Sequence, residues 1–292
     1  MVKASVPPIE ELRPGQSVEL LKELHILTRE GKLNQDTRRK LKQVYHLYQF
    51  IEPLLNEAFS RNPSPSLADH GAGKSYLGFI LYDLFFNVAH RGEKKAGHIY
   101  GIETRAELVE RSRALAHRLG FERMSFLNLS VREATASAEL PAVVDIITAL
   151  HACDTATDDA IAFGLARHAR HMVLVPCCQA EVAGVLKRSK ALSLSRTPLA
   201  ELWRHPLHTR EFGSQITNVL RCLQLEAHGY QVSVTELVGW EHSMKNELII
   251  ASLPERASAS KTEAARERLE EVLATLGLGD LSERFAAPAA SA

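Results

Sequence analysis

Residues 66–77, Ser-Leu-Ala-Asp-His-Gly-Ala-Gly-Lys-Ser-Tyr-Leu, form the stretch that decides the fold of this chain. Asp69 ends an apolar run typical of a buried strand. Gly71 and Gly73 then predict a tight turn, because a residue without a Cβ atom turns freely and approaches a ligand closely. The apolar run 76–88 predicts the helix that follows. A helix behind a glycine loop presents free N–H groups and a positive dipole end, so this stretch suits a polar or anionic ligand.

Strands and helices alternate after this stretch. Apolar, β-rich runs predict strands at 98–103, 124–131, 142–150 and 171–175. Helical patterns predict helices at 104–119 and 161–169. This alternation is typical of α/β proteins, so we expect a Rossmann-like, mostly parallel seven-stranded sheet with helices on both faces.

The flanking segments complete this architecture. Helical periodicity predicts an N-terminal arm with helices at 18–28 and 36–59, a helical insertion at 181–229, and a last helix from a capping box at 260–263 to Leu276. Two further strands, 230–238 and 247–253, are close enough in sequence to form an antiparallel hairpin. We therefore divide the chain into an N-terminal arm (1–60), a main domain (61–254) and a C-terminal helix with its tail (255–292).

Composition narrows the class of protein. The 292 residues carry 35 basic and 35 acidic side chains, so no global charge attracts nucleic acid or membrane. No apolar run has the roughly 18 residues that a membrane-spanning helix needs, and the N-terminus lacks the apolar core of a signal peptide. Four cysteines in a chain of this length do not indicate a disulfide framework. These features favour a cytoplasmic protein with no membrane partner.

Two classes of ligand compete for the glycine loop. The sequence Gly73-Lys74-Ser75 copies the end of a nucleotide-binding P-loop, but that motif requires a glycine at position 68, where this chain has alanine. The P-loop nucleotidase interpretation is therefore weak. The second class is an adenosine-bearing cofactor, whose ribose is held by an acid at the end of the second strand. Glu103 is such an acid, and together with Asp69 and the glycines it favours the cofactor.

At this point the chain resembles a known family. The stretch DHGAGKSYL resembles motif I of class I S-adenosylmethionine-dependent methyltransferases. LHACDTATDDAI (150–161), VPCCQ (175–179) and EHSMKN (241–246) together resemble one branch of that superfamily. The branch contains bacterial methyltransferase-domain proteins, eukaryotic relatives of rRNA adenine dimethylases, and tRNA 2′-O-methyltransferases. The resemblance covers residues 35–253 and implies S-adenosyl-L-methionine as cofactor.

The resemblance also implies a role for individual residues. Asp69, Gly71 and Gly73 would line the methionine and ribose side of the cofactor, and Glu103 would bind the ribose hydroxyls. Ser130 and Val131 would flank the adenine, while Leu150 and His151 would lie beside the reacting methyl group. Lys74 would pair with the methionine carboxylate or with Asp69, and both alternatives stay open.

Catalysis needs a base only when the acceptor must lose a proton, and His151 or Asp154 could supply it. Two structural alternatives compete with these roles: His151 as a hydrogen-bonded residue at a strand end, and Asp154 as the cap of a helix that starts near Thr157. The adjacent cysteines Cys177 and Cys178 lack the spacing of a zinc site, so we expect buried thiols and no metal.

The resemblance suggests RNA, either rRNA or tRNA, as the methyl acceptor. Basic residues in stretches 38–42 and 187–210 could contact a phosphate backbone, although a solvated helix face explains 38–42 equally simply. Trp203 could stack on a base or belong to the core. The alternatives are a methyltransferase acting on a small molecule or a protein, and a non-catalytic module that only binds the cofactor.

Overall fold

The computed structural model describes residues 11–90, 96–150, 154–176, 179–189, 197–237 and 247–286. The chain divides into two compact units, Met1–Asn128 and Leu129–Ala292, and each is described by itself. Seven strands form one sheet in the order β3-β2-β1-β4-β5-β7-β6, with helices packed around it. The predicted α/β fold is confirmed.

The first unit supplies three parallel strands, β1 (Ser66–His70), β2 (His98–Ile102) and β3 (Met124–Leu127). Its helices are α1 (Val18–Glu23), α2 (Gln35–Arg61), α3 (Tyr76–Leu81) and α4 (Ala106–Leu119), and α3 continues as a π-helix, η1 (Tyr82–Ala89). Because β1 and β2 run parallel, with Asp69 opposite Gly101, both strands end at the same edge. That edge carries the glycine loop and Glu103.

Two boundaries in this part of the chain differ from prediction. Helix α1 ends at Glu23 instead of Thr28, and His25 just beyond it adopts a left-handed conformation with φ of 55°. Strand β3 ends at Leu127, and Val131 is the first residue of helix α5 (Val131–Ala136) rather than the last residue of a strand. The hydroxyl of Ser130 starts this helix by accepting the Glu133 N–H, so a local capping box overrides the apolar strand pattern.

The second unit supplies the parallel pair β4 (Ile146–Leu150) and β5 (His171–Val175). The hairpin strands β6 (Gln231–Glu236) and β7 (Glu247–Ser252) are antiparallel as predicted, and β7 pairs with β5. The remaining elements are α6 (Ala156–Ala166), α7 (Glu181–Ser189), α8 (Pro206–Ala227), α9 (Ala259–Thr275) and the 3-10 turns η3 (Pro198–Trp203) and η4 (Gly279–Leu281). Over its described residues, the insertion 181–229 is helical, as expected.

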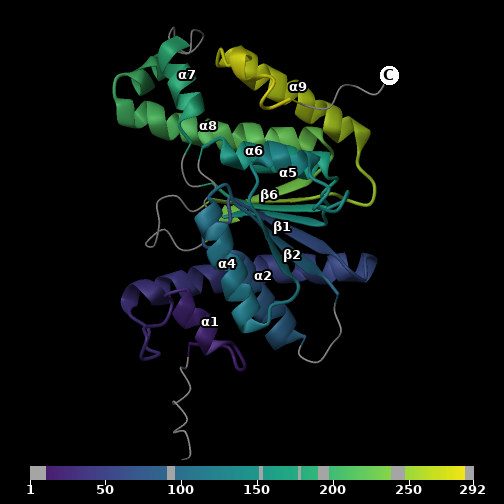
Figure 1. Cartoon of the computed structure of the whole chain (residues 1–292). Coiled ribbons are helices and arrows are strands. Elements are labelled where there is room, and N and C mark those ends of the chain that lie inside the picture. Colours follow the sequence, from purple (N-terminus) through teal and green to yellow (C-terminus); the bar gives the residue numbers. More distant parts are fainter. Residues whose placement is uncertain are drawn as a thin grey trace, which may run out of the picture. The chain divides into compact units, whose positions relative to one another are not determined.

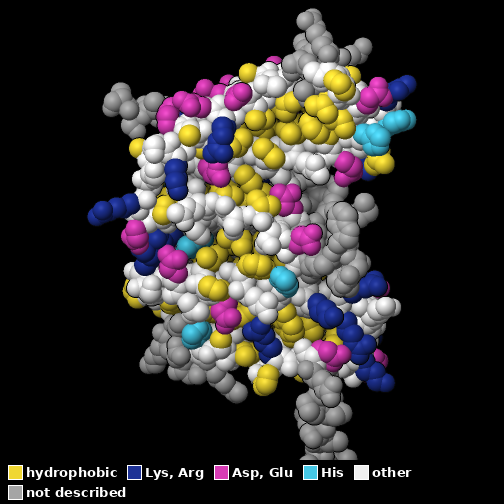
Figure 2. Space-filling view, turned by 180° about the vertical axis from the view of Figure 1, so that it is seen from behind, with side chains coloured by type: hydrophobic (Ala, Val, Ile, Leu, Met, Phe, Trp, Pro, Cys, Tyr) yellow, Lys and Arg dark blue, Asp and Glu magenta, His cyan; other side chains and the backbone are white. Residues whose placement is uncertain are grey.

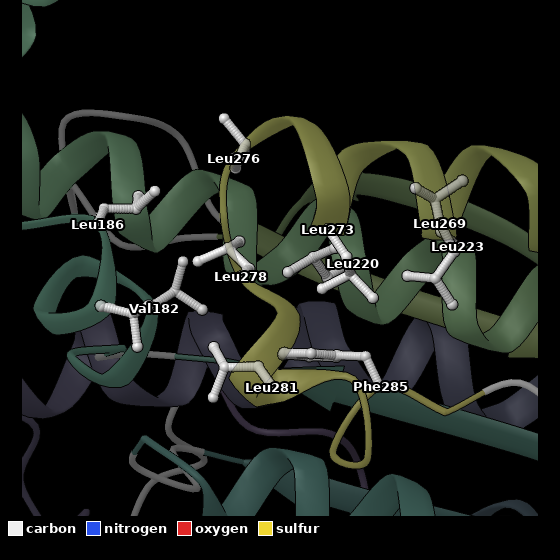
Figure 3. Close-up of a cluster of buried hydrophobic side chains, with 11 residues drawn as sticks. Val182, Leu186, Leu220, Leu223, Leu269, Leu273, Leu276, Leu278, Leu281 and Phe285 are labelled. Atoms are coloured by element: carbon white, nitrogen blue, oxygen red, sulfur yellow. The ribbon is translucent and has the colours of Figure 1, made fainter. Parts of the chain in front are cut away.

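Helices α8 and α9 run side by side and share an apolar core (Figure 1). Leu220 and Leu223 of α8 face Leu269 and Leu273 of α9, and Phe285 closes the cluster from the segment after η4 (Figure 3). Trp203 packs against this cluster and makes an edge-to-face contact with Phe212, with ring centroids 5.6 Å apart. The cluster fixes the position of α8, which carries the buried arginine described below.

One predicted cap is wrong. Helix α9 begins after Ser258, whose side chain makes no capping hydrogen bond, so the predicted capping box at 260–263 does not start the helix. Among the described residues, no helix is both long and apolar enough to cross a membrane.

Candidate functional site

The glycine loop turns through three left-handed residues. Gly71, Gly73 and Ser75 have φ values of 63°, 57° and 54°. The loop folds over the end of β2, where the Ala72 N–H donates to the Ile102 carbonyl at 3.1 Å. A Cβ atom at Gly71 or Gly73 would be strained whatever the space around it, so the two predicted glycines are required by the backbone. Asp69 lies in β1 with 2% of its surface exposed.

Glu103 is held at the centre of this loop. The Gly73 N–H donates to Glu103 Oε2 at 2.8 Å, and the Arg105 N–H donates to Oε1 at 3.0 Å. The Arg105 guanidinium adds a bidentate contact, with Nε 3.0 Å from Oε1 and Nη2 3.2 Å from Oε2. Burial opposes ionisation, but these hydrogen bonds lower the pKa of Glu103 from an ordinary 4.5 to about 2. The carboxylate is therefore charged at any physiological pH.

This arrangement can accept a ribose. A carboxylate at the end of β2 that is almost buried and permanently charged is a strong acceptor for hydroxyl donors. The Nε and Nη2 groups of Arg105 donate to the two carboxylate oxygens of Glu103. These oxygens are also the acceptors that two vicinal ribose hydroxyls would use. Because the Arg105 side chain is 61% exposed, it can swing into solvent when another donor pair arrives. Arg105 was not predicted from the sequence, although it follows Glu103 by only two residues.

Lys74 directly follows Gly73 in the glycine loop. Its exposed side chain lines a hollow together with the end of α1 and one face of α4. Among the described residues it forms no ion pair and no side-chain hydrogen bond. The alternative in which Lys74 pairs with Asp69 is therefore not what the structure contains.

The predicted adenine contacts, Ser130 and Val131, lie at the start of α5 in the second unit. The Ser130 N–H and hydroxyl both donate to Glu133 Oε2 at 2.7 Å. The polar groups of Ser130 are thus used within the helix cap, which leaves the chain around Val131 to make apolar contacts. Leu150 is the last residue of β4, and His151, Cys153, Cys177, Cys178, Lys245 and Asn246 lie outside the described residues.

Asp154 does cap a helix, but not the predicted one. It has a left-handed φ of 49°, and α6 begins at Ala156 without a side-chain cap. Asp154 Oδ1 instead accepts the N–H groups of Ala180 at 2.9 Å and Glu181 at 3.3 Å, at the start of α7. A carboxylate is stabilised there by the helix dipole. The Asp154 side chain therefore joins the segment after β4 to the segment after β5.

Arg221 of α8 anchors the same region from the interior. Its side chain is 0% exposed, and its Nε and Nη2 donate to the two carboxylate oxygens of Asp158 at 2.6 and 2.8 Å. Nη2 also donates to the Asp154 carbonyl at 2.9 Å, and Nη1 to Asn218 Oδ1 at 3.1 Å. A buried guanidinium with four such contacts is fully paired, as a buried charge must be.

The hydrogen bonds continue from Asn218 to two further segments. Gln179 Nε2 donates to Asn218 Oδ1 at 3.0 Å, and Asn218 Nδ2 donates to Glu247 Oε2 at 2.6 Å. Gln179 Oε1 accepts the Ser214 hydroxyl at 2.5 Å. Helix α7 can lie this close to α8 because of Gly213, where a Cβ atom would be 2.6 Å from Ala183 Cα.

This network joins two of the three motifs that the sequence singled out to the residue that follows the third. Asp154 and Asp158 belong to LHACDTATDDAI, Gln179 ends VPCCQ, and Glu247 directly follows EHSMKN. The sequence showed these motifs as separate stretches, and it gave no signal that Arg221, inside the helical insertion, connects them. The sequence does place Arg221 among apolar residues of a helix, where an unpaired charge is costly. That position indicates that Arg221 has a partner, but not which one.

Among the described residues, no group of three or more His, Cys, Asp or Glu side chains could hold a metal ion. The adjacent cysteines Cys177 and Cys178, the pair weighed for a metal in the sequence, lie outside those residues. The expectation of no metal therefore stays a prediction.

Comparison with known proteins finds one matching family and several similar structures. A family model described as a methyltransferase domain matches residues 39–185, half of the chain. An rRNA methylase from Streptococcus thermophilus is similar in structure, with 8% identity, a TM-score of 0.46, and coverage of 70% of this chain and 95% of that one. A candidate O-methyltransferase from Klebsiella pneumoniae has 12% identity and a TM-score of 0.49, with 84% and 93% covered. Magnesium protoporphyrin IX methyltransferase from Synechocystis, solved with bound SAH, has 14% identity and a TM-score of 0.43, with 80% and 94% covered. No curated protein matches the chain.

The family model defines the class of this protein as a methyl-transferring enzyme. The chain belongs to the methyltransferase-domain family, and its cofactor is S-adenosylmethionine, as predicted. The residues fit this cofactor: Glu103 is buried and ionised, and the loop before it needs glycine at two positions.

Proposed function

We propose that this methyltransferase acts on RNA by direct methyl transfer. The observation that carries the proposal is the network around Arg221. Two of the three motifs that resemble the branch containing rRNA- and tRNA-modifying enzymes contribute to one set of hydrogen bonds, which also reaches Glu247, directly after the third motif. They therefore work as one structural unit in this chain. The unit begins directly after β4, where the resemblance puts the reacting methyl group.

The proposed roles are those that the resemblance implies for each residue. Glu103 binds the ribose hydroxyls after Arg105 has moved away, and Asp69, Gly71, Gly73 and Lys74 line the methionine side. Ser130 and Val131 flank the adenine, and Leu150 lies beside the methyl group. Bound S-adenosylmethionine supplies a methyl group on a sulfonium that carries its own leaving group, so positioning of the acceptor provides much of the acceleration.

His151 is the proposed base for an acceptor that must lose a proton. Asp154, the second predicted base, has its carboxylate engaged by two N–H groups of α7. We therefore assign Asp154 a positioning role, because it fixes the chain three residues after His151. Arg221 supports the same segment through the Asp154 carbonyl.

The acceptor class is tested by incubating the purified chain with methyl-labelled S-adenosylmethionine and separate RNA, protein and small-molecule fractions of a cell extract. We expect label in RNA, and a modified nucleoside that is absent from RNA of cells lacking this protein. Label confined to the protein or small-molecule fraction would assign the enzyme to the alternative acceptor class. S-adenosylmethionine binding in calorimetry with no label in any fraction would favour the non-catalytic module, and absence of binding would contradict the proposed function itself.

A further inference from the structure

Two hollows lie side by side in the first unit, next to the glycine loop. The first, of about 300 Å³, is lined by Lys74, Tyr76, Arg111 and Arg118 together with the end of α1. The second, of about 610 Å³, is lined by Lys22, Arg29 and the start of α2. Glu23 and His25 line both hollows. We call the two together the α1 groove.

Unpaired positive charge concentrates in this groove. It is lined by five Lys or Arg side chains and one acid, Glu23, which pairs with Arg118 at 3.0 Å. Lys22, Arg29, Lys74 and Arg111 form no ion pair with any described residue, although the exposed Glu30 lies beside Arg29. On the face that Figure 2 shows, by contrast, Lys and Arg side chains lie interspersed with Asp and Glu side chains.

The predicted basic stretch 38–42 differs from this groove. Arg38 pairs with Glu11 at 2.8 Å, and Arg39 lies 3.9 Å from Asp36. Two of the four basic side chains in this stretch form ion pairs with described residues, whereas only one of the five in the groove, Arg118, does. In a chain with zero formal net charge, four cations left unpaired in one concave surface point to an anionic ligand.

The shape and lining of the groove favour a nucleic acid strand over a membrane. Membrane surfaces require exposed apolar anchors beside the cations, and Val18 is the only large exposed hydrophobic among the described residues of this unit. The groove instead combines cations with the half-buried ring of Tyr76, and single strands bind through such combinations of charge and aromatic stacking.

We propose that the α1 groove binds the phosphate backbone of the RNA that this enzyme methylates. The inference rests on the proposed function. Lys22 and Arg29 would contact phosphates in one hollow, and Arg111 in the other. Lys74 belongs to both the groove and the glycine loop, so a strand bound here lies directly beside the loop that holds the cofactor. The salt dependence of RNA binding would then come mainly from these side chains.

The test compares two double variants with the same loss of charge. R29Q/R111Q removes two unpaired cations of the groove, whereas K40Q/K42Q removes two cations of the basic stretch on α2. Binding of a fluorescent single-stranded RNA of mixed sequence is measured between 50 and 200 mM salt, and S-adenosylmethionine binding is measured in parallel. For R29Q/R111Q we expect at least about tenfold weaker RNA binding and a salt slope smaller by about 1.4, since each lost contact to a single strand removes about 0.7.

The parallel measurements separate the two proposals. Unchanged S-adenosylmethionine affinity in R29Q/R111Q, with RNA binding weakened only in that variant, supports the groove. If K40Q/K42Q loses the RNA affinity instead, or both variants bind as the wild type does while RNA is still methylated, the groove proposal is wrong and the proposed function stands. If the wild-type chain binds the cofactor but neither binds nor methylates RNA, the proposed function is wrong, and the groove proposal that rests on it is wrong as well.

Discussion

Two carboxylate–arginine pairs in this chain have the same bidentate geometry but differ in exposure. In the pair Glu103–Arg105 the arginine side chain is 61% exposed, whereas in Asp158–Arg221 it is 0% exposed. A ligand can displace the first arginine, because water solvates it once it has left. The second cannot leave without stranding a charge in the interior. The first pair therefore suits a binding site, and the second holds a site in place.

The largest effect is expected from removing the buried arginine. Arg221→Met leaves the Asp158 carboxylate buried and unpaired, which should lower the free energy of unfolding by about 3–5 kcal/mol. Urea denaturation followed by circular dichroism measures this loss. Arg210→Met on the same helix is the matched control, because Arg210 pairs at the surface with Glu211 and should contribute less than about 1 kcal/mol. Equal losses in the two variants would refute the distinction between the pairs.

The second effect concerns cofactor affinity. Glu103→Gln removes the charge that strengthens hydrogen bonds from the ribose, so S-adenosylmethionine binding should weaken by about 1.5–3 kcal/mol, or about 10- to 150-fold. Calorimetry measures the dissociation constant directly. Glu107→Gln, an exposed acid in the first turn of α4, should leave it unchanged. Full affinity in Glu103→Gln would show that the ribose is held elsewhere.

The Glu103 carboxylate also makes the folding stability depend on pH. The folded-state pKa of Glu103 is about 2 against an ordinary 4.5, so its stabilising contribution is complete above pH 4.5 and is lost as the pH falls toward 2. Between pH 4.5 and pH 3 this loss can reach about 2 kcal/mol, since one proton contributes at most about 1.4 kcal/mol per pH unit. Unfolding of wild type and Glu103→Gln at both pH values tests it. The variant should lose less stability on acidification, and an equal loss in both chains would contradict the prediction.

The sequence predicted one of these two regions much better than the other. The acid of the exposed pair follows a strand and a glycine loop, so local pattern alone predicts Glu103 as a binding residue. Arg105 was missed because its role depends on a side-chain conformation that spacing does not encode. The buried pair joins residues 63 positions apart, Asp158 and Arg221. Such a contact depends on how the helical insertion packs, which no local pattern reveals.

The wrong boundaries have a similar origin. The apolar run 124–131 fits a strand, but the Ser130–Glu133 cap starts a helix within it, so two local signals competed and the cap prevailed. Capping of the adjacent helix was one of two roles predicted for Asp154, but the helix that it caps is α7 and not α6. Sequence identifies what a side chain can do more readily than which distant amide it will meet.

A smaller effect is expected at the junction between the two motif segments. Asp154→Ala removes the carboxylate that accepts two N–H groups of α7, and loss of such a cap typically costs about 1 kcal/mol, within a range of about 0.5–2. Asp154→Asn keeps an acceptor oxygen and tolerates the left-handed backbone, so it should retain most of the stability. Thermal unfolding of both variants distinguishes the cap from the backbone strain. If Asp154→Asn lowers the stability as much as Asp154→Ala does, the stabilisation comes from the charge of Asp154 alone and not from its acceptor oxygen.

The smallest effect is the most specific to the exposed pair. Arg105→Gln removes a guanidinium that water already solvates, so folding stability should change by less than about 1 kcal/mol. Cofactor affinity should stay equal or rise, by up to about fivefold, because the ribose no longer competes with a bidentate donor for Glu103. Arg113→Gln, which removes a half-exposed arginine elsewhere on α4, is the control. Weaker S-adenosylmethionine binding in Arg105→Gln alone would mean that the guanidinium assists the bound cofactor instead of standing in its place. Arg105 would then act in the same way as the buried arginine, as a fixed support for a carboxylate.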